Sequence, residues 1–376
     1  MAQASDVYGL SDQERLDRLR LCRSEHVGPI TFLNLMRRSG DAGAALDALP
    51  DLARRGGLKR GIRLCPRDRA EQELEALENA GGRLITLGEP IYPRPLAAIA
   101  DPPPVISVLG RAEFLDRDAI AIVGARNASA AGGRFARGLA ADLGAGGLAV
   151  ASGMARGIDT EAHVGSVETG TIAVLAGGVD NIYPPENDAL HQRIAEVGAI
   201  ISEQPFGLAP QGRHFPRRNR IISGLALGVV VVEASLRSGS LITARLAGEQ
   251  GRDVFAVPGS PLDPRHRGTN RLIRDGAMLT EGADDVRNAL GVTPRGRLQD
   301  SPSGRFKPSQ AADSKSFEAT EAQRRSVSAA LGPTPVGVDE LVRQCHLTPA
   351  EVMVVILELE LAGRLRRHAG GMISIT

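Results

Sequence analysis

Residues 120–159 read IAIVGARNASAAGGRFARGLAADLGAGGLAVASGMARGID, and this stretch indicates the fold of the central part of the chain. It begins with a short apolar run, Ile120–Val123, and contains a second one, Leu148–Ser152. A glycine-containing turn follows each run, and a helical segment separates the two. Apolar runs of this length, separated by a helix, are typical of parallel strands that are covered on both faces. The stretch therefore predicts a strand–helix–strand unit.

The same alternation continues after this unit. Four more apolar runs are expected to be strands, at Thr171–Ala176, Ala199–Ser202, Val229–Glu233 and Asp253–Val257. Repeated units of this kind predict an α/β fold with a doubly wound, Rossmann-like sheet. The first turn lacks the G-x-G-x-x-G pattern of dinucleotide-binding proteins, so we expect no such cofactor.

Changes in composition divide the chain into four segments. Residues 1–90 read as short helices, and residues 91–290 as the Rossmann-like core, with Asp101-Pro102-Pro103-Pro104 close to its start. Residues 291–320 are rich in Pro, Ser, Gly and charge, which predicts a flexible linker. Residues 321–376 predict three helices and a terminal hairpin, the pattern of a winged helix.

One connection in the N-terminal segment has two interpretations. Val27-Gly28-Pro29-Ile30 resembles a helix-hairpin-helix loop, which can hold a phosphate on a helix N-terminus. We favour a plain helical scaffold, because one short loop is a weak motif.

The composition excludes several classes of protein. The 376 residues carry 45 Lys and Arg against 44 Asp and Glu, so a basic site must be a local cluster. The three cysteines form no CxxC pair and the histidines show no metal spacing, so we expect neither a disulfide framework nor a metal site. Residues 1–20 lack the apolar segment of a signal peptide, and no run is long enough for a membrane span. We therefore expect a cytoplasmic protein.

Two turns after predicted strands contain both glycine and arginine. The first is Gly124-Ala125-Arg126-Asn127, where glycine allows close backbone approach and arginine offers donors to phosphate. The second is Ser152–Asp159, in which Gly153 and Gly157 flank Arg156 and Asp159 is placed to cap the next helix. We interpret these turns as phosphate-binding positions. His163, one turn further on, is expected to be structural.

The most basic stretch is QGRHFPRRNR at residues 211–220. It contains no acidic residue, whereas a solvated helix face normally mixes charges of both signs. Phe215 lies among the arginines, and an aromatic ring beside phosphate-binding arginines is a known solution for single-stranded nucleic acid. The candidate binding residues of this stretch are Arg213, Phe215, Arg217, Arg218, Asn219 and Arg220. In addition, we expect Arg218 or Arg220 to be partly structural, with Glu203 or Glu233 as a partner.

Taken together and in order, these motifs resemble the DprA/Smf family of DNA-processing proteins. The matching strings are AIVGARNAS, ASGMARGIDTEAH, AVLAGGVDNIYPPEN, ISEQPFG, FPRRNRIISGL, VVVEASLRSGSLITA and VFAVPGS, and they cover roughly residues 110–280. The resemblance implies an extended Rossmann fold with an N-terminal sterile-alpha-motif-like domain and a C-terminal winged helix. It also implies a homodimer that binds single-stranded DNA, protects incoming DNA and loads the RecA recombinase in natural transformation, with no catalytic residue.

The resemblance also assigns a phosphate pocket. It implies that the pocket contains Gly124, Arg126, Ser152, Gly153 and Gly157, with the Arg218-Asn219-Arg220 motif, and we place Arg213 at its rim. The family's first turn often has a hydroxyl residue where this chain has Ala125, which removes one side-chain donor.

Two alternatives remain open at this stage. SGSLITA after a strand that ends in Glu233 resembles the phosphate loop of nucleotide phosphoribohydrolases, for which Glu233 or Asp159 would be the catalytic carboxylate. The second alternative is a regulator that reads duplex DNA through its winged helix. The predicted recognition helix, Thr348–Ala362, carries three glutamates and no Lys or Arg, so we expect it to serve packing or protein contacts instead.

Overall fold

The computed structural model describes residues 10–291 and 318–376. These residues form two compact units, one of residues 72–291 and one that combines residues 10–71 with residues 318–376. The linker predicted at 291–320 falls almost entirely on residues 292–317, which lie outside the described residues, as do residues 1–9.

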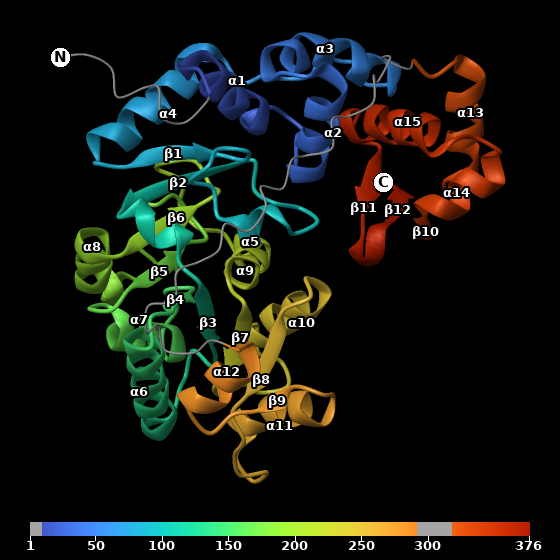
Figure 1. The fold of residues 1–376 in the computed structure, drawn as a ribbon. Helices are drawn as coiled ribbons and strands as arrows, with labels where there is room; N and C mark the ends of the chain where they lie inside the picture. The colour runs from blue at the N-terminus through green and yellow to red at the C-terminus, as the bar shows by residue number, and fades with distance from the viewer. Residues whose placement is uncertain (1–9, 292–317) are drawn as a thin grey trace. The chain divides into compact units, whose positions relative to one another are not determined.

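A single large sheet organises the first unit (Figure 1). Within the described residues it has nine strands in the order β1-β2-β6-β5-β4-β3-β7-β8-β9, and the seven strands from β6 across to β9 are parallel to one another. All six predicted strands are present: β3 (Ala119–Val123), β4 (Ala149–Ser152), β5 (Thr171–Val174), β6 (Ala199–Ser202), β7 (Gly228–Val231) and β8 (Asp253–Ala256). The doubly wound, Rossmann-like α/β prediction is confirmed.

Three short strands were not predicted. β9 (Met278–Leu279) extends the parallel sheet, whereas β1 (Arg83–Thr86) and β2 (Val105–Gly110) add an antiparallel edge beyond β6. Because β1 pairs with β2, the sheet begins before residue 91, where sequence analysis placed the start of the core. A four-residue strand that begins with an exposed arginine carries too little apolar pattern to be recognised.

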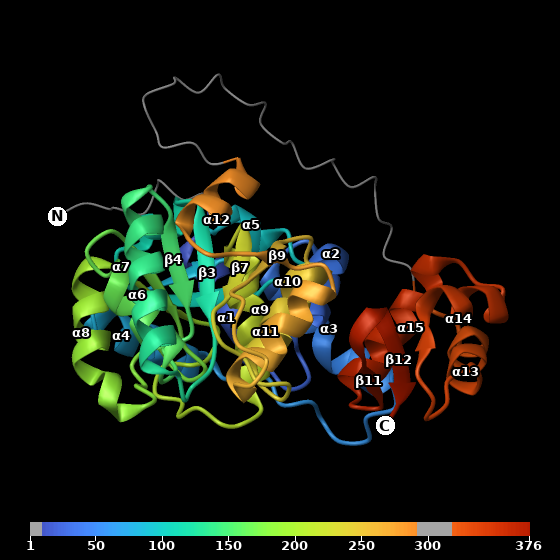
Figure 2. The same cartoon turned by 90° about the horizontal axis from the view of Figure 1, so that it is seen from below.

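Helices cover both faces of the sheet, because successive residues of a buried strand point to opposite faces (Figure 2). Ile120 and Ile122 pack with α6, α7 and α12, whereas Ala121 and Val123 pack with α5, α9 and α10. The helices of this unit are α5 (Arg94–Ala97), α6 (Ala130–Ala145), α7 (Ile158–Ser166), α8 (Asp188–Val197), α9 (His214–Leu225), α10 (Ser240–Glu249), α11 (Arg267–Arg274) and α12 (Ala283–Leu290), with 3-10 turns at Ala112–Asp116, Pro185–Asn187 and Pro264–His266.

The second unit contains helices from both ends of the described chain. The N-terminal helices are α1 (Asp12–Arg23), α2 (Pro29–Ser39), α3 (Ala42–Arg55) and α4 (Arg67–Asn79), whose second half falls in the first unit. The C-terminal part confirms the predicted winged helix, with α13 (Glu321–Ala330), β10 (Val336–Gly337), α14 (Val338–Cys345), α15 (Pro349–Leu361), β11 (Leu365–Arg367), a 3-10 turn at Ala369–Gly371 and β12 (Met372–Ile375).

The winged helix packs against the N-terminal helices through α15. Leu357 and Leu361 are buried in the same apolar cluster as Leu46, Leu49 and Leu52 of α3. The two helices approach so closely at Gly56 that a Cβ there would lie 1.8 Å from the Glu358 carbonyl oxygen. The α15 side chains outside the winged-helix core are therefore used for packing on α3, as the acidic character of this helix predicts.

Within the part of the chain that the structure describes, no helix is both long and apolar enough to cross a membrane.

Candidate functional site

The principal cavity lies where the strand order of the sheet reverses. From β3 the chain continues through β4 and β5 to β6 on one side, and it later returns to β7 and β8 on the other. In open α/β sheets this is the position at which ligands bind, beyond the carboxyl ends of the strands. The cavity measures about 520 Å³, and its walls come from the turns after β3 and β7 and from α9.

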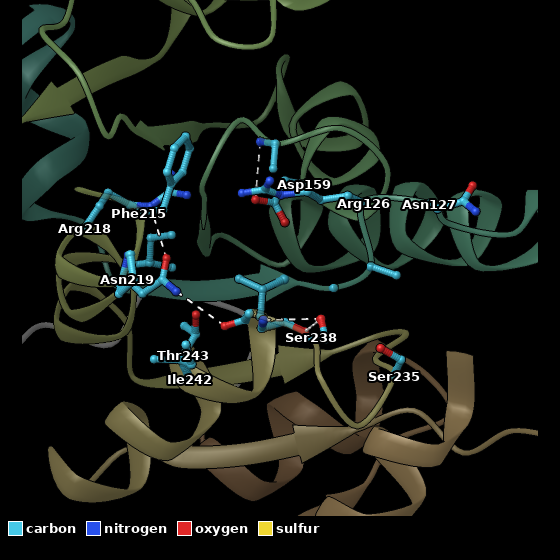
Figure 3. Close-up of a pocket in the computed structure, with 18 of the residues that line it drawn as sticks. Arg126, Asn127, Asp159, Phe215, Arg218, Asn219, Ser235, Ser238, Ile242 and Thr243 are labelled. Carbon is cyan, nitrogen blue, oxygen red and sulfur yellow. Dashed lines mark hydrogen bonds between the residues drawn. The ribbon is translucent and has the colours of Figure 1, made fainter. Parts of the chain in front are cut away.

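Figure 3 shows the side chains around this cavity. The turn after β3 supplies Gly124, Ala125, Arg126 and Asn127, and α9 supplies Phe215, Pro216, Arg218, Asn219 and Ile222. The segment after β7 supplies Ser235, Ser238, Gly239, Ser240, Ile242 and Thr243, while Val123, Ala155, Asp159 and Arg265 complete the lining. The sequence prediction of the binding site included the first turn and α9, whereas the loop after β7 entered only through the SGSLITA phosphate-loop alternative.

The two glycine turns are held together by backbone contacts. The Ile158 amide donates to the Ala125 carbonyl oxygen at 3.2 Å. Gly157 has a φ of +79°, and a Cβ at this position would lie 2.3 Å from the Ala125 oxygen. Only glycine meets both requirements, so Gly157 positions the first turn and does not itself line the cavity.

Arg126 is the exposed cation of the site. Its guanidinium lies over the ring of Phe215, 5.1 Å from the ring centroid, which is the geometry of a cation–π contact. The side chain lines the principal cavity and also a second cavity of about 380 Å³. Arg126 is therefore oriented by α9 while its donors stay accessible to a ligand.

Arg218 supplies charge from a buried position. Its Nη1 donates to the Gly153 carbonyl oxygen at 2.6 Å and to the Val174 carbonyl oxygen. Burial lowers the pKa of Arg218 to about 10, so the guanidinium stays charged at neutral pH. It is thus both structural and part of the cavity lining, as sequence analysis expected for one arginine of this motif. Asn219 links α9 to the start of α10 by donating to the Gly239 carbonyl oxygen at 3.4 Å.

Asp159 is a buried acid on the cavity wall. Burial raises the pKa of Asp159 to about 6, although the nearby Arg218 acts in the opposite direction. Its carboxylate accepts from the Ala155 amide at 3.4 Å, while Gly157 occupies the cap position of α7. The expectation that Asp159 caps the helix is therefore wrong: it lies inside the first turn.

Arg220 lies away from both cavities. It is buried, its Nη2 forms an ion pair with Glu203, and its Nη1 donates to the Asp101 carbonyl oxygen at 2.6 Å. This is the structural pairing expected for one arginine of the stretch, and it assigns Arg220 to holding α9 in place. Ser152 is also buried, with its Oγ donating to the Ile122 carbonyl oxygen at 2.6 Å.

Arg213 and Arg217 are exposed on α9 and line neither cavity. Neither forms an ion pair with any residue that the structure describes. Burial lowers the pKa of His214, and the two arginines lower it further. They therefore add positive potential at the N-terminal end of α9 without contributing to the cavity walls.

The second cavity contains a residue that the site prediction omitted. Its lining includes Gly153, Arg156, Tyr183 and Phe215, and Arg156 forms an ion pair with Glu186. The rings of Tyr183 and Phe215 meet edge to face, with centroids 5.7 Å apart. Tyr183 is 50% exposed. Its unusual exposure is a three-dimensional property that no local sequence pattern reports.

Glu233, one of the two carboxylates proposed for an enzyme, is already hydrogen-bonded within the fold. Glu233 is 1% exposed and accepts from the Ser129 amide at 2.9 Å and from the Ser129 Oγ at 2.5 Å. Ser129 in turn caps α6 by accepting from the Gly132 amide. Glu233 thus lies at the N-terminal end of α6, bound to its cap residue. His163 is buried and its Nδ1 contacts Thr171 Oγ1 at 2.7 Å, a structural arrangement.

Three protein-family models together match most of the chain. The family model described as DNA recombination-mediator protein A matches residues 83–291. Models described as a DprA-like N-terminal HHH domain and a DprA winged helix domain match residues 12–76 and 308–371. The first of these two supports the helix-hairpin-helix interpretation of Val27–Ile30 over the plain scaffold that we favoured.

Individual relatives agree with these matches. Protein Smf of Escherichia coli is 37% identical over 314 residues, which cover 82% of each chain. DNA processing protein DprA of Bacillus subtilis is 43% identical over 216 residues, which cover 57% of this chain and 73% of that protein.

Two solved structures are similar over most of their length. DNA processing protein A from Streptococcus pneumoniae superposes with a TM-score of 0.60 at 33% identity, covering 73% of this chain and 95% of that one. The protein from Helicobacter pylori, whose structure was determined for its single-stranded DNA binding mode, gives a TM-score of 0.51 at 30% identity and covers 56% and 97%.

Proposed function

Because this chain belongs to the family of DNA recombination-mediator protein A, we propose that it binds single-stranded DNA in the cavity beyond β3 and β7. The observation that carries the proposal is Arg126, a cation held 5.1 Å over the Phe215 ring at a cavity that the buried Arg218 also lines. This places a hydrogen-bond donor for phosphate beside an aromatic surface for a base, a combination that is typical of single-strand binding sites.

The contacts are mainly to phosphate. Arg126 offers its donors from an exposed position, while Ser235, Ser238 and Thr243 add hydroxyl groups on the opposite wall. Arg213 and Arg217 attract the strand from outside the cavity. None of these groups reads a base edge in a duplex groove, so we expect little sequence preference.

The biological role follows from this binding. We propose that the protein acts in the cytoplasm, protects incoming single strands and transfers them to the RecA recombinase during natural transformation. The description of the matching family as a recombination mediator supports this role. We propose no catalytic activity: the arrangement of Glu233 disfavours a phosphoribohydrolase, because that carboxylate is already bound to Ser129.

We further propose a homodimer formed through the Rossmann-like unit, within residues 229–280. Three large apolar side chains of this segment are exposed, Leu236, Leu262 and Leu279, with Leu262 91% exposed. Two cavities on one dimer would engage a single strand together and raise the apparent affinity. A monomer by light scattering at micromolar concentration, with undiminished DNA binding, would refute this proposal.

We propose that the winged helix does not bind in a groove of duplex DNA. Its α15 packs on α3, and Glu358 pairs with Arg324 inside the domain, so much of the helix is already used for contacts within its own unit. A stable, sequence-specific complex of the full chain with duplex DNA, lost on substitution of α15, would contradict this.

The experiment that tests the main proposal compares a fluorescent oligothymidine with a duplex of equal length. We expect the full chain to prefer the single strand and Arg126→Ala to weaken binding. The matched control is Arg193→Ala, since Arg193 is an exposed arginine on α8 that lines neither cavity. Equal affinity for both DNA forms, or equal loss in the two variants, would refute the proposal.

A further inference from the structure

The second cavity adjoins the first and shares four lining residues with it, Arg126, Asn127, Ala155 and Phe215. Its volume of about 380 Å³ is within the range of small-ligand sites. A strand whose phosphate is held by Arg126 therefore passes beside this cavity.

The aromatic surface of this cavity is provided by two rings with different environments. Phe215 is partly covered, because the Arg126 guanidinium lies over its ring. Tyr183 meets Phe215 edge to face at 5.7 Å, yet half of its surface remains exposed. Its hydroxyl forms no hydrogen bond with any residue that the structure describes. Tyr183 thus presents an aromatic ring of which half remains accessible to a ligand.

We propose that the second cavity is a nucleobase subsite in which an unpaired base stacks on Tyr183, next to the phosphate at Arg126. The proposal rests on the proposed function and extends it from phosphate contacts to base contacts. Pro184 adds an apolar wall. Arg156 lines this cavity and pairs with Glu186, and this nearby carboxylate makes the cavity less favourable for a second phosphate than for an uncharged base.

The subsite also provides a reason for discrimination against duplex DNA. Stacking on a protein ring requires a base that has left its own stack, which costs free energy in a duplex and little in a single strand. Arg126 can attract either form of DNA, whereas stacking on Tyr183 stabilises only the complex with a single strand.

The test distinguishes contacts to the bases from contacts to the phosphate backbone. Binding is measured by fluorescence anisotropy with oligothymidine and with an abasic oligomer of the same length, which keeps every phosphate and lacks every base. We expect Tyr183→Ala to weaken oligothymidine binding roughly five- to a hundredfold and to leave the abasic oligomer unaffected. Tyr183→Phe keeps the ring and should bind both oligomers like the wild type.

A second readout reports stacking directly. An oligomer with one 2-aminopurine should lose fluorescence when bound by the wild type and by Tyr183→Phe, and it should keep more fluorescence with Tyr183→Ala. The subsite is refuted if Tyr183→Ala weakens both oligomers equally or neither. If the wild type binds neither oligomer, the proposed function itself fails, which is a distinct outcome.

Discussion

The guanidinium of Arg126 lies 5.1 Å from the centre of the Phe215 ring, and this contact joins the turn after β3 to the first turn of α9. Arg126 is exposed, so without the ring its side chain would sample many rotamers before it met a phosphate. The ring therefore reduces the entropy that the arginine loses when DNA binds.

The first prediction concerns this pair. Phe215→Leu should weaken single-strand binding through loss of orientation as well as loss of stacking. In a double-mutant cycle with Arg126→Ala, we expect a coupling of about 0.5–1 kcal/mol, the usual strength of an exposed cation–π contact. Additive effects of the two substitutions on binding free energy would show that the contact has no role.

A second prediction concerns pH. The pKa of Asp159 is raised to about 6 by burial, and its carboxylate lines the cavity that we propose to bind phosphate. Protonation removes a negative charge from that wall, so a bound phosphate favours the neutral form. Affinity for oligothymidine should therefore increase as the pH falls toward about 6 and level off below it.

The control for this effect is Asp159→Asn, which is neutral at every pH. It should bind more tightly than the wild type at neutral pH and show a flat profile through this range. The charged groups that act on Asp159 are the guanidinium groups of Arg218 and Arg126. A profile that persists in the variant would therefore assign the effect to another residue, such as His214.

The third prediction distinguishes Arg220 from Arg126. Arg220 is buried and pairs with Glu203, whose side chain is only 14% exposed, so substitution of Arg220 removes a cation from beside a largely covered carboxylate. We expect Arg220→Met to lower the free energy of unfolding by about 3–5 kcal/mol. Arg126→Ala, at an exposed site, should change stability little. If the double variant Arg220→Met with Glu203→Gln is no more stable than the single variant, the ion pair is not the cause.

A fourth prediction concerns the contact between α15 and α3. Gly56→Ala places a methyl group 1.8 Å from the Glu358 carbonyl oxygen, so the helices must separate, at a cost of about 1–3 kcal/mol. Faster hydrogen exchange in α15 should report this separation. Gly61→Ala is the matched control, because a Cβ there meets nothing within 4 Å.

The same contact bears on truncation. A chain that ends at residue 290 should keep most of its affinity for single-stranded DNA, because the cavity residues lie between 123 and 265. It should, however, lose stability in its N-terminal helices, since Leu46, Leu49 and Leu52 lose the cover of α15. Loss of DNA binding in this truncated chain would show that the winged helix takes part.

The sequence predicted the parts of this structure that local patterns encode. Apolar runs identified the six central strands, and turn residues with helical spacing identified the winged helix. It also indicated Arg126 and Phe215, because glycine turns and a basic stretch are local features. It could not separate Arg218 from Arg220, which are two residues apart on one helix but face different partners. It also missed Tyr183, whose proposed role depends on its contact with Phe215, a residue distant in sequence.

The most direct test of the proposed function is the salt dependence of oligothymidine binding by the wild type and by Arg126→Ala. For a single strand, the logarithm of affinity falls with the logarithm of salt concentration by about 0.7 for each phosphate neutralised. If Arg126 binds one phosphate, its substitution should make the slope shallower by about 0.7, whereas Arg193→Ala should leave it unchanged. An unaltered slope in Arg126→Ala would contradict the phosphate contact at the centre of the proposed site.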